Sequence, residues 1–140
     1  MEDIKCECSE LISYPLIVLE EQKSKIVFEN KNRIEINKIT VDGCQITDER
    51  PRCDYLLIKV DENTEYFVEL KGHDINRALE QIEATIPRLS KDMRQQKKYC
   101  FIISVRTPMS STQIQNIAKS YKKKYNAELI MKSSPGSHTL

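Results

Sequence analysis

The sequence predicts one mixed α/β domain, in which a central, mostly antiparallel or mixed sheet is flanked by helices. Three observations favour this class. Apolar and polar residues alternate with the period of strands across 25–41 and 55–70. The period changes to that of a helix over 75–89. A nearly continuous apolar run follows at 99–105, as expected of a strand covered on both faces by helices.

The N-terminal half is expected to contain a helix and two hairpins. The segment 9–22 has no clean period, and we expect a helix within it. Residues 25–41 are expected to fold as a hairpin around a polar turn, and 47–52, with Pro51, as a loop. Two apolar runs separated by an acidic turn, 55–60 and 66–70, are predicted to pair as a second, antiparallel hairpin.

The C-terminal half alternates helices and strands. Asp74 is a good N-cap for the helix over 75–89, and Pro87 should end or kink it. Ser110 or Ser111 should begin a second helix, and 127–131 a short last strand. We expect a single domain over 1–132 and a flexible tail over 133–140.

Composition indicates a soluble, cytoplasmic protein without a membrane partner. A chain of 140 residues is large enough for one core, and 39% of its residues are hydrophobic. None of its apolar runs approaches the length of a membrane span, and its first residues do not resemble a signal peptide. Its five cysteines are an odd number, so we expect reduced thiols. Four of them could in principle form a zinc site, but their spacing argues against it: Cys6, Cys8, Cys44 and Cys53.

Charge is divided between the two halves of the chain. Residues 1–85 contain 11 Lys and Arg against 19 Asp and Glu, a net charge of −8, whereas 86–140 contain 11 against 2, a net charge of +9. Such a basic half favours a nucleic-acid partner, although a solvated helix face would have the same composition. Ten of these eleven cations lie before residue 125: Arg88, Lys91, Arg94, Lys97, Lys98, Arg106, Lys119, Lys122, Lys123 and Lys124.

The strongest candidate for chemistry is a pair of carboxylates with a lysine on the second predicted hairpin. Asp54 opens its first strand, and Glu69 and Lys71 share one face at the end of its second. Two carboxylates a few ångströms apart repel by several kcal/mol at an effective dielectric of about 20, and a divalent cation relieves this repulsion. We therefore predict a Mg²⁺ or Mn²⁺ site at Asp54, Glu69 and the Leu70 carbonyl, with Lys71 acting on the phosphoryl group during phosphodiester hydrolysis. The alternative is an ordinary surface Glu/Lys pair.

This spacing, Asp54 followed after fifteen residues by Glu69-Leu70-Lys71 on the next strand, resembles the PD-(D/E)XK nuclease superfamily. The resemblance covers about 25–105, and it departs from the superfamily pattern at Cys53, where a proline is usual. It implies a restriction-endonuclease-like or junction-resolvase-like αβββαβ core, a Mg²⁺-dependent nuclease, and DNA more than RNA as the partner. Restriction, repair, junction resolution and defence are the settings in which such proteins work, often as homodimers or with a larger partner protein.

The resemblance also implies further site residues. An additional acid belongs in the first helix, for which Glu10, Glu20 and Glu21 are the candidates. Gln81 resembles a glutamine that some members use near the metal, although it is equally placed as a boundary residue of its helix.

Three more residues are candidates for substrate binding by their position alone. His73 could contact a phosphate or assist proton transfer, and Arg50 and Arg52 could clamp phosphate just before Asp54. The alternative function is a catalytically silent nuclease-fold module, a scaffold for a nucleic-acid-processing or defence complex. A domain that docks a basic protein through its acidic half is the other alternative.

Overall fold

The computed structural model describes residues 1–70, 74–105 and 110–140, and over these it confirms the mixed α/β class. Within these ranges nine strands form two sheets beside two α-helices. In chain order the elements are a 3₁₀ turn (Cys6–Cys8), β1 (Ser9–Ile12), β2 (Leu16–Glu21), β3 (Ser24–Glu29), β4 (Ile36–Thr40), β5 (Tyr55–Lys59), β6 (Glu65–Leu70), α1 (Ile75–Leu89), β7 (Lys98–Ser104), α2 (Ser111–Tyr125), β8 (Ala127–Ser133) and β9 (Gly136–Thr139).

The larger sheet has six strands in the order β1-β4-β5-β6-β7-β8. Its first four strands are antiparallel neighbours, and β6, β7 and β8 run parallel. The predicted hairpin that carries the candidate site is confirmed, because β5 pairs antiparallel with β6 and Tyr55 lies opposite Val68. Parallel pairing beyond β6 follows from the helical crossovers α1 and α2.

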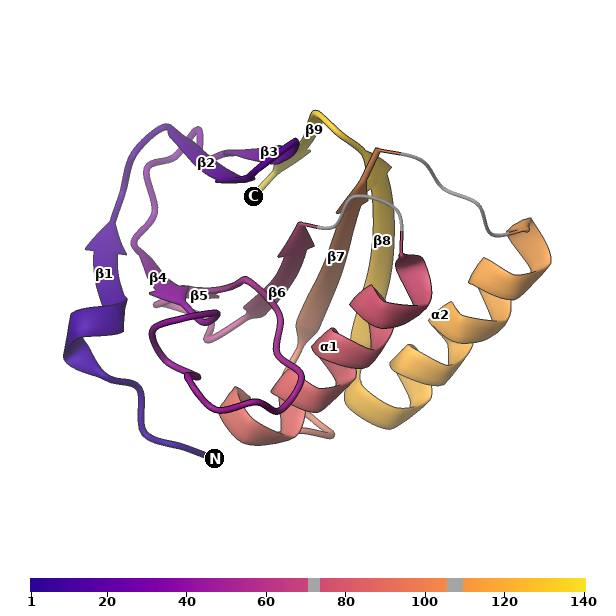
Figure 1. Ribbon diagram of the computed structural model, residues 1–140. Coiled ribbons are helices and arrows are strands. Elements are labelled where there is room, and N and C mark those ends of the chain that lie inside the picture. The colour runs from indigo at the N-terminus through magenta and orange to yellow at the C-terminus, as the bar shows by residue number, and fades with distance from the viewer. Residues whose placement is uncertain (71–73, 106–109) are drawn as a thin grey trace.

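Both helices cover the same face of this sheet (Figure 1). Asp74 caps α1 as predicted, since its Oδ1 accepts from the Arg77 N–H at 3.0 Å. Pro87 lies inside the last turn without ending the helix there, because the helix runs on to Leu89. Ser110 caps α2 through a capping box. The buried Tyr121 hydroxyl of α2 donates to the carbonyl oxygen of Leu79 in α1 at 3.0 Å, which ties the two helices together.

The other face of the large sheet is covered by a second sheet, so the prediction of helices on both faces is wrong. Its three strands have the order β2-β3-β9. Phe28 of β3 and Phe101 of β7 meet between the sheets with ring centroids 5.2 Å apart, and both are fully buried. An apolar strand such as β7 needs cover on both faces, but its sequence does not distinguish a helix from a sheet as that cover.

Two expected elements at the N-terminal end are wrong. The segment 9–22 forms β1 and β2 instead of a helix, because Ile17 and Leu19 alternate into the core with period two. Residues 25–41 do not form a hairpin, since β3 pairs with β2 and β4 pairs with β1 and β5. The turn between β3 and β4 carries the chain from one sheet to the other.

The expected flexible tail, 133–140, is instead part of the fold. β8 extends to Ser133, and β9 pairs in parallel with β3, with His138 opposite Phe28. The Leu140 N–H then donates to the Glu29 carbonyl oxygen at 2.9 Å. A polar segment with a proline, as here, is typical of a flexible end, but the backbone hydrogen bonds of a strand do not depend on apolar side chains.

The cysteines also differ from the expectation of reduced thiols. Cys8 and Cys44 form a disulfide between the start of β1 and the loop after β4. Cys53 and Cys100 are buried free thiols, and Cys6 is an exposed one. Because Cys8 and Cys44 bond to each other, the four-thiolate zinc alternative is not formed.

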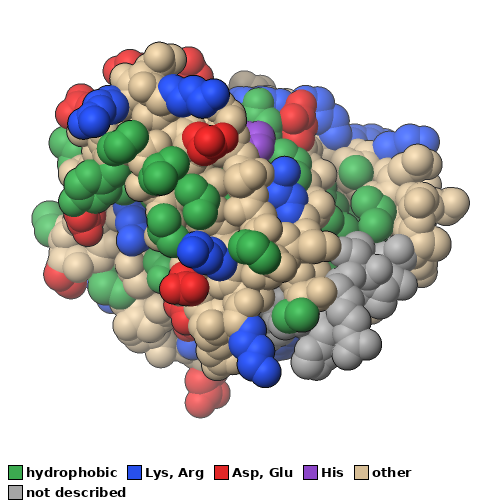
Figure 2. Space-filling model, turned by 90° about the horizontal axis from the view of Figure 1, so that it is seen from above, with side chains coloured by type: hydrophobic (Ala, Val, Ile, Leu, Met, Phe, Trp, Pro, Cys, Tyr) green, Lys and Arg blue, Asp and Glu red, His purple; other side chains and the backbone are tan. Residues whose placement is uncertain are grey.

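The outer face of the small sheet carries exposed apolar side chains. Leu16 and Val18 of β2 are 56% and 46% exposed, and Tyr14 precedes them at 58%. Figure 2 looks onto this side of the molecule and shows hydrophobic side chains gathered on its left part. Among the described residues, no helix is long and apolar enough to cross a membrane.

Candidate metal centre

Asp54 is held at the junction of three strands by its backbone. Its N–H donates to the Val68 carbonyl oxygen of β6 at 3.1 Å. Its own carbonyl oxygen accepts from the N–H groups of Val41 and Asp42, at 2.9 and 3.3 Å, where β4 ends. These bonds explain why an aspartate directly before β5 has a fixed position beside the end of β6.

The Asp54 and Glu69 side chains are brought together as predicted. Asp54 Oδ2 accepts from the Leu70 N–H at 2.8 Å, so its carboxyl group lies beside the last residue of β6. The Glu69 side chain, which is 2% exposed, lies close enough to Asp54 to influence its pKa. Two neighbouring carboxyl groups repel unless one of them holds a proton, and a cation between them would relieve the same repulsion.

In the absence of a cation, the electrostatic surroundings make Asp54 harder to ionise than an exposed aspartate. The pKa of Asp54 is raised to about 6, first by burial and then by the charges of Glu21 and Asp42, against the lowering effects of the Leu70 N–H and of Glu69. A buried carboxyl group with a raised pKa beside a second carboxyl is typical of functional sites. It is the arrangement that a divalent cation stabilises most.

Of the three candidates for an additional acid, the structure brings Glu21 to the site. Glu21 follows Ile17 and Leu19 on the inner face of β2, and its Oε1 accepts from the Tyr55 hydroxyl at 3.4 Å. Glu20 lies on the outer face opposite Lys25, and Glu10 lies on β1 opposite Lys38. The expected helix is absent, and the two-residue period of a strand selects Glu21.

Two residues near the site were missed by the sequence reasoning. Asp42 adds its charge to that of Glu21 near Asp54. Tyr55 begins β5, and burial together with Glu21 and Asp54 raises the pKa of its hydroxyl. No local signal marked Asp42, because its nearness depends on the turn that β4 makes toward Asp54.

Gln81 lies beside the segment that leads to Asp54. Its Nε2 donates to the Arg52 carbonyl oxygen at 3.2 Å. Thr85, one turn further along α1, accepts from the Cys53 N–H at 2.8 Å. Gln81 Oε1 is buried and, among the described residues, accepts no hydrogen bond. Residues 52 and 53 are thus attached to α1, and Gln81 offers a buried acceptor beside Arg52.

The two arginines expected to clamp phosphate are engaged by carboxylates. Arg50 Nη2 contacts Asp48 at 2.9 Å, and Arg52 Nε contacts Asp42 at 2.9 Å. Hydrogen bonds from Arg50 and Arg88 hold the pKa of Asp48 well below its usual range. Phosphate binding by Arg50 or Arg52 would have to replace these contacts, and both remain only sequence-based candidates. Lys71 and His73, the remaining candidates, lie outside the described residues.

The basic C-terminal half does not form one continuous cationic surface. Lys98 is fully buried, and its Nζ donates to the carbonyl oxygens of Asp92, Gln96 and Tyr125 at 2.8, 2.7 and 3.0 Å. Arg88 forms ion pairs with Glu2 and Asp48. Ion pairs also link Lys97 to Glu128 and Lys124 to Glu83, and Arg106 lies outside the described residues. Among the described residues of this half, the exposed cations outside these ion pairs are Lys91, Arg94, Lys119, Lys122 and Lys123.

The donor set at Asp54 and Glu69 fits a hard divalent cation. Carboxylate and carbonyl oxygens are the ligands that Mg²⁺ and Mn²⁺ prefer, and Mg²⁺ is commonly held by one or two carboxylates together with waters and substrate phosphates. Within the described ranges no three His, Cys, Asp or Glu side chains converge closely enough to bind a metal.

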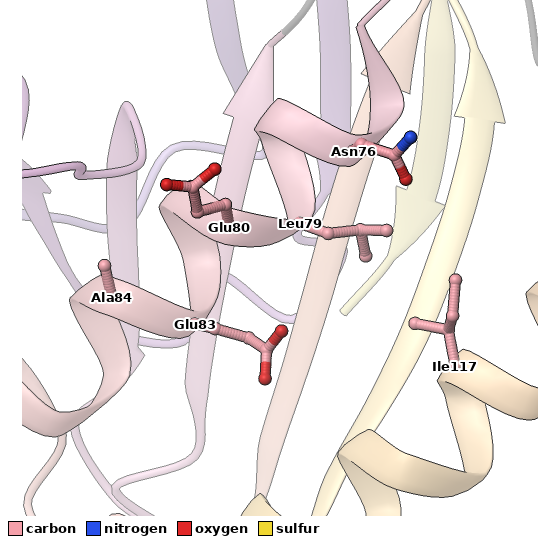
Figure 3. Close-up of a pocket in the computed structure, with 6 residues that line it drawn as sticks. All are labelled: Asn76, Leu79, Glu80, Glu83, Ala84 and Ile117. Carbon is pink, nitrogen blue, oxygen red and sulfur yellow. The ribbon is translucent and has the colours of Figure 1, made fainter.

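A groove of about 580 Å³ lies elsewhere, between the outer sides of α1 and α2. Figure 3 shows Leu79 and Ile117 pointing toward each other across it, with the Glu83 carboxylate beside them. Glu83 also accepts from the Tyr125 hydroxyl at 2.9 Å. The groove is separate from the Asp54 and Glu69 pair, which lies at the end of β6.

Comparison with known proteins does not identify the chain. No known protein family, no curated protein and no solved structure matches it. The arrangement of Asp54, Glu69 and their neighbours is therefore the basis for an inference about function.

Proposed function

We propose that this protein is a metal-dependent nuclease, which hydrolyses phosphodiester bonds of nucleic acid, DNA more than RNA, with Mg²⁺ or Mn²⁺ as cofactor. The observation that supports it is the buried contact between the carboxyl groups of Asp54 and Glu69 at the end of β6. At an effective dielectric of about 20, two such charges about 4 Å apart repel by roughly 4 kcal/mol. A fold that keeps them in contact gains most from a cation at that point.

Each residue has a defined part in this proposal. Asp54 and Glu69 bind the cation, with the Leu70 carbonyl oxygen as a further ligand, and Lys71 stabilises charge on the phosphoryl group. A bound divalent cation polarises a phosphate oxygen and lowers the pKa of a bound water. Gln81 Oε1, a buried acceptor beside Arg52, is suited to orienting a water or a substrate hydroxyl.

The substrate class rests on the resemblance of Asp54 and Glu69-Leu70-Lys71 to the PD-(D/E)XK pattern. The order of elements along the chain supports this resemblance, because β6, which carries Glu69, is followed by α1 and then by β7. One feature departs from the core that the resemblance implies, since strands β1 and β2 replace its first helix. Glu21 on β2 supplies negative charge near Asp54.

Metal binding tests the proposal most directly. We expect isothermal titration to show Mg²⁺ and Mn²⁺ binding to the wild type and its loss in Asp54→Asn and Glu69→Gln. Glu80→Gln, on the exposed side of α1, is the matched control and should bind as the wild type does. Metal-dependent cleavage of single-stranded or duplex DNA or RNA should be lost in the same two variants and in Lys71→Ala.

Three outcomes would change the conclusion. Cleavage retained in Glu69→Gln would contradict the assignment of the site. Metal binding without cleavage would favour the alternative, a catalytically silent nuclease-fold module that acts as a scaffold for a processing or defence complex. Failure of the wild type to bind either metal would exclude both the cofactor and the hydrolytic role.

A further inference from the structure

The face of the large sheet opposite the helices carries a row of aromatic rings near the start of β6 and β7. Tyr66 and Tyr99 lie opposite each other on these strands, and their rings stack with centroids 5.1 Å apart and planes 13° from parallel. Next to them the rings of Phe101 and His138 lie 4.8 Å apart. Tyr66 is 2% exposed, whereas Tyr99 is partly exposed, so Tyr99 is the ring that a ligand could reach.

Lysines surround these rings. Lys97 Nζ lies 5.0 Å from the centroid of the Tyr99 ring, and Lys59 Nζ lies 5.8 Å from that of Tyr66. Lys132 of β8 also belongs to the group, because burial lowers the pKa of His138 and the charges of Lys132 and Lys59 lower it further. Three cationic side chains, all partly exposed, therefore lie around one stack of rings.

Two acids face the same group and limit its charge. Glu128 lies opposite Tyr99 on β8, and its Oε1 pairs with Lys97 Nζ at 3.3 Å. Glu62, in the turn between β5 and β6, is close enough to Tyr66 to raise the pKa of its hydroxyl, after the larger effects of burial and Tyr99. The balance among these side chains remains positive, with Lys59, Lys97 and Lys132 against Glu62 and Glu128.

A partly exposed aromatic ring among lysines has the two features that bind single-stranded nucleic acid. An unpaired base stacks on the ring, and the neighbouring ammonium groups neutralise phosphates. A duplex fits less well, because its bases already stack on one another and do not present their faces. A partner protein with acidic residues would use the lysines but would gain little from the Tyr99 ring.

We propose that Tyr99, together with Lys59, Lys97 and Lys132, forms a binding site for single-stranded nucleic acid that is separate from the carboxylate pair. Tyr66 and Tyr99 lie on the face of the sheet covered by the small sheet, while Glu69 alternates to the helix-covered face. A nucleic-acid strand bound at this site would be held by the protein while another part of the same nucleic acid reaches Asp54 and Glu69. That purpose rests on the proposed nuclease function, but the binding itself does not.

Fluorescence anisotropy in the presence of EDTA tests binding without any contribution from metal or cleavage. The probes are a labelled mixed-sequence single-stranded oligodeoxynucleotide, the RNA of the same sequence, and the DNA duplex. We expect the wild type to bind single strands more tightly than the duplex, and the DNA and RNA arms show which sugar is preferred. Tyr99→Ala should weaken single-strand binding about tenfold or more, whereas Tyr99→Phe should retain it.

Substitutions of the lysines and of Glu128 should change the binding affinity in opposite directions. Lys59→Gln and Lys132→Gln should each weaken binding and reduce the slope of log K against log salt by about 0.7. Glu128→Gln should tighten binding, because it frees Lys97 for phosphate. Lys123→Gln, an exposed lysine on α2, is the matched control and should have little effect. Thermal unfolding checks that each variant folds.

The proposal is overturned if folded Tyr99→Ala and Lys59→Gln bind single strands as the wild type does, or if the wild type binds none of the three probes. Tighter duplex binding that is insensitive to Tyr99 would also overturn it and indicate a purely ionic contact. Failure of the nuclease proposal would give a different result: the wild type would bind no metal at Asp54 and Glu69 but would still bind single-stranded nucleic acid.

Discussion

At the scale of single residues, Asp54 links proton binding to stability. Its pKa is about 6 in the folded protein against 3.8 for an unperturbed aspartate, so between these values the fold holds a proton that the unfolded chain has released. The unfolding free energy should therefore fall as pH rises from about 4 to about 6, by an amount on the order of 2 to 3 kcal/mol. Urea unfolding across this pH range, without divalent metal, measures it.

Asp54→Asn should remove this contribution, because an amide does not titrate. The difference between the wild-type and Asp54→Asn curves isolates Asp54 from other groups, such as Glu65, whose pKa is also raised by burial. Asp61→Asn, in the exposed turn after β5, should keep the wild-type curve. Equal pH dependence in the wild type and Asp54→Asn would contradict the prediction.

Lys98 shows that a basic residue can be structural. Its buried ammonium group donates to three backbone carbonyl oxygens, from Asp92, Gln96 and Tyr125, and so joins the end of α2 to the loop before β7. Lys98→Met would fill the same space but leave all three acceptors without this donor. We expect urea unfolding to show a loss of about 3 kcal/mol or more.

The exposed Lys91→Met is the matched control for Lys98→Met and should change stability by no more than about 0.5 kcal/mol. A similarly small effect at Lys98 would mean that water satisfies the three carbonyls as well as the ammonium group does.

At the scale of elements, the Cys8–Cys44 disulfide fixes β1 relative to the loop after β4. The bond spans a sequence separation of 36 residues, for which the loop-entropy account gives a stabilisation of about 4 kcal/mol. We expect a dithiol reductant to lower the melting temperature of the wild type. The double variant Cys8→Ser, Cys44→Ser should melt at that lower temperature with or without reductant.

Cys6→Ser is the control for this prediction, because Cys6 is exposed and outside the disulfide. It should behave like the wild type in both conditions. A wild-type melting temperature that does not respond to reductant would show that the bond contributes no stability. Disulfides are rare in the cytoplasm, so mass spectrometry of alkylated protein from cells also tests the cytoplasmic location expected from the sequence.

At the scale of the whole molecule, the last residues complete the apolar core between the two sheets. β9 pairs with β3, and His138 packs on Phe28 and Phe101 between the two sheets. Ending the chain after Ser133 would expose these rings, and we expect the unfolding free energy to fall by about 3 kcal/mol or more. Ser137→Ala, an exposed position on the same strand, should have little effect. An unchanged stability after truncation would indicate the flexible tail that the sequence suggests.

The structure confirms the predictions that depend on local pattern. Each of these predictions depends on a short stretch of sequence. They are the alternation that predicted β5 and β6, the helical period of α1, and the caps at Asp74 and Ser110. The nearness of Asp54 and Glu69 was predictable for the same reason, since a short turn sets the register of their two strands. Local hydrogen bonding and side-chain period determine each of these features.

The predictions that failed concern segments whose partners lie far away in the sequence. Nothing within 9–22 shows that β2 will cover β5 and β6, and nothing within 133–140 shows that β9 will pair with β3. The nearness of Glu21 and Asp42 to Asp54, the burial of Lys98 and the disulfide depend in the same way on how two sheets and a loop assemble.

The sequence by itself determined the mixed α/β class, the central hairpin with Asp54 and Glu69, and the two helices that follow it, because these features arise from neighbouring residues. Only the tertiary structure decided that a second sheet covers the back of the first, that Glu21 is the acid brought to the site, and that Tyr99 lies among lysines. Long-range contacts depend on the shape of whole layers, which no short pattern of residues specifies.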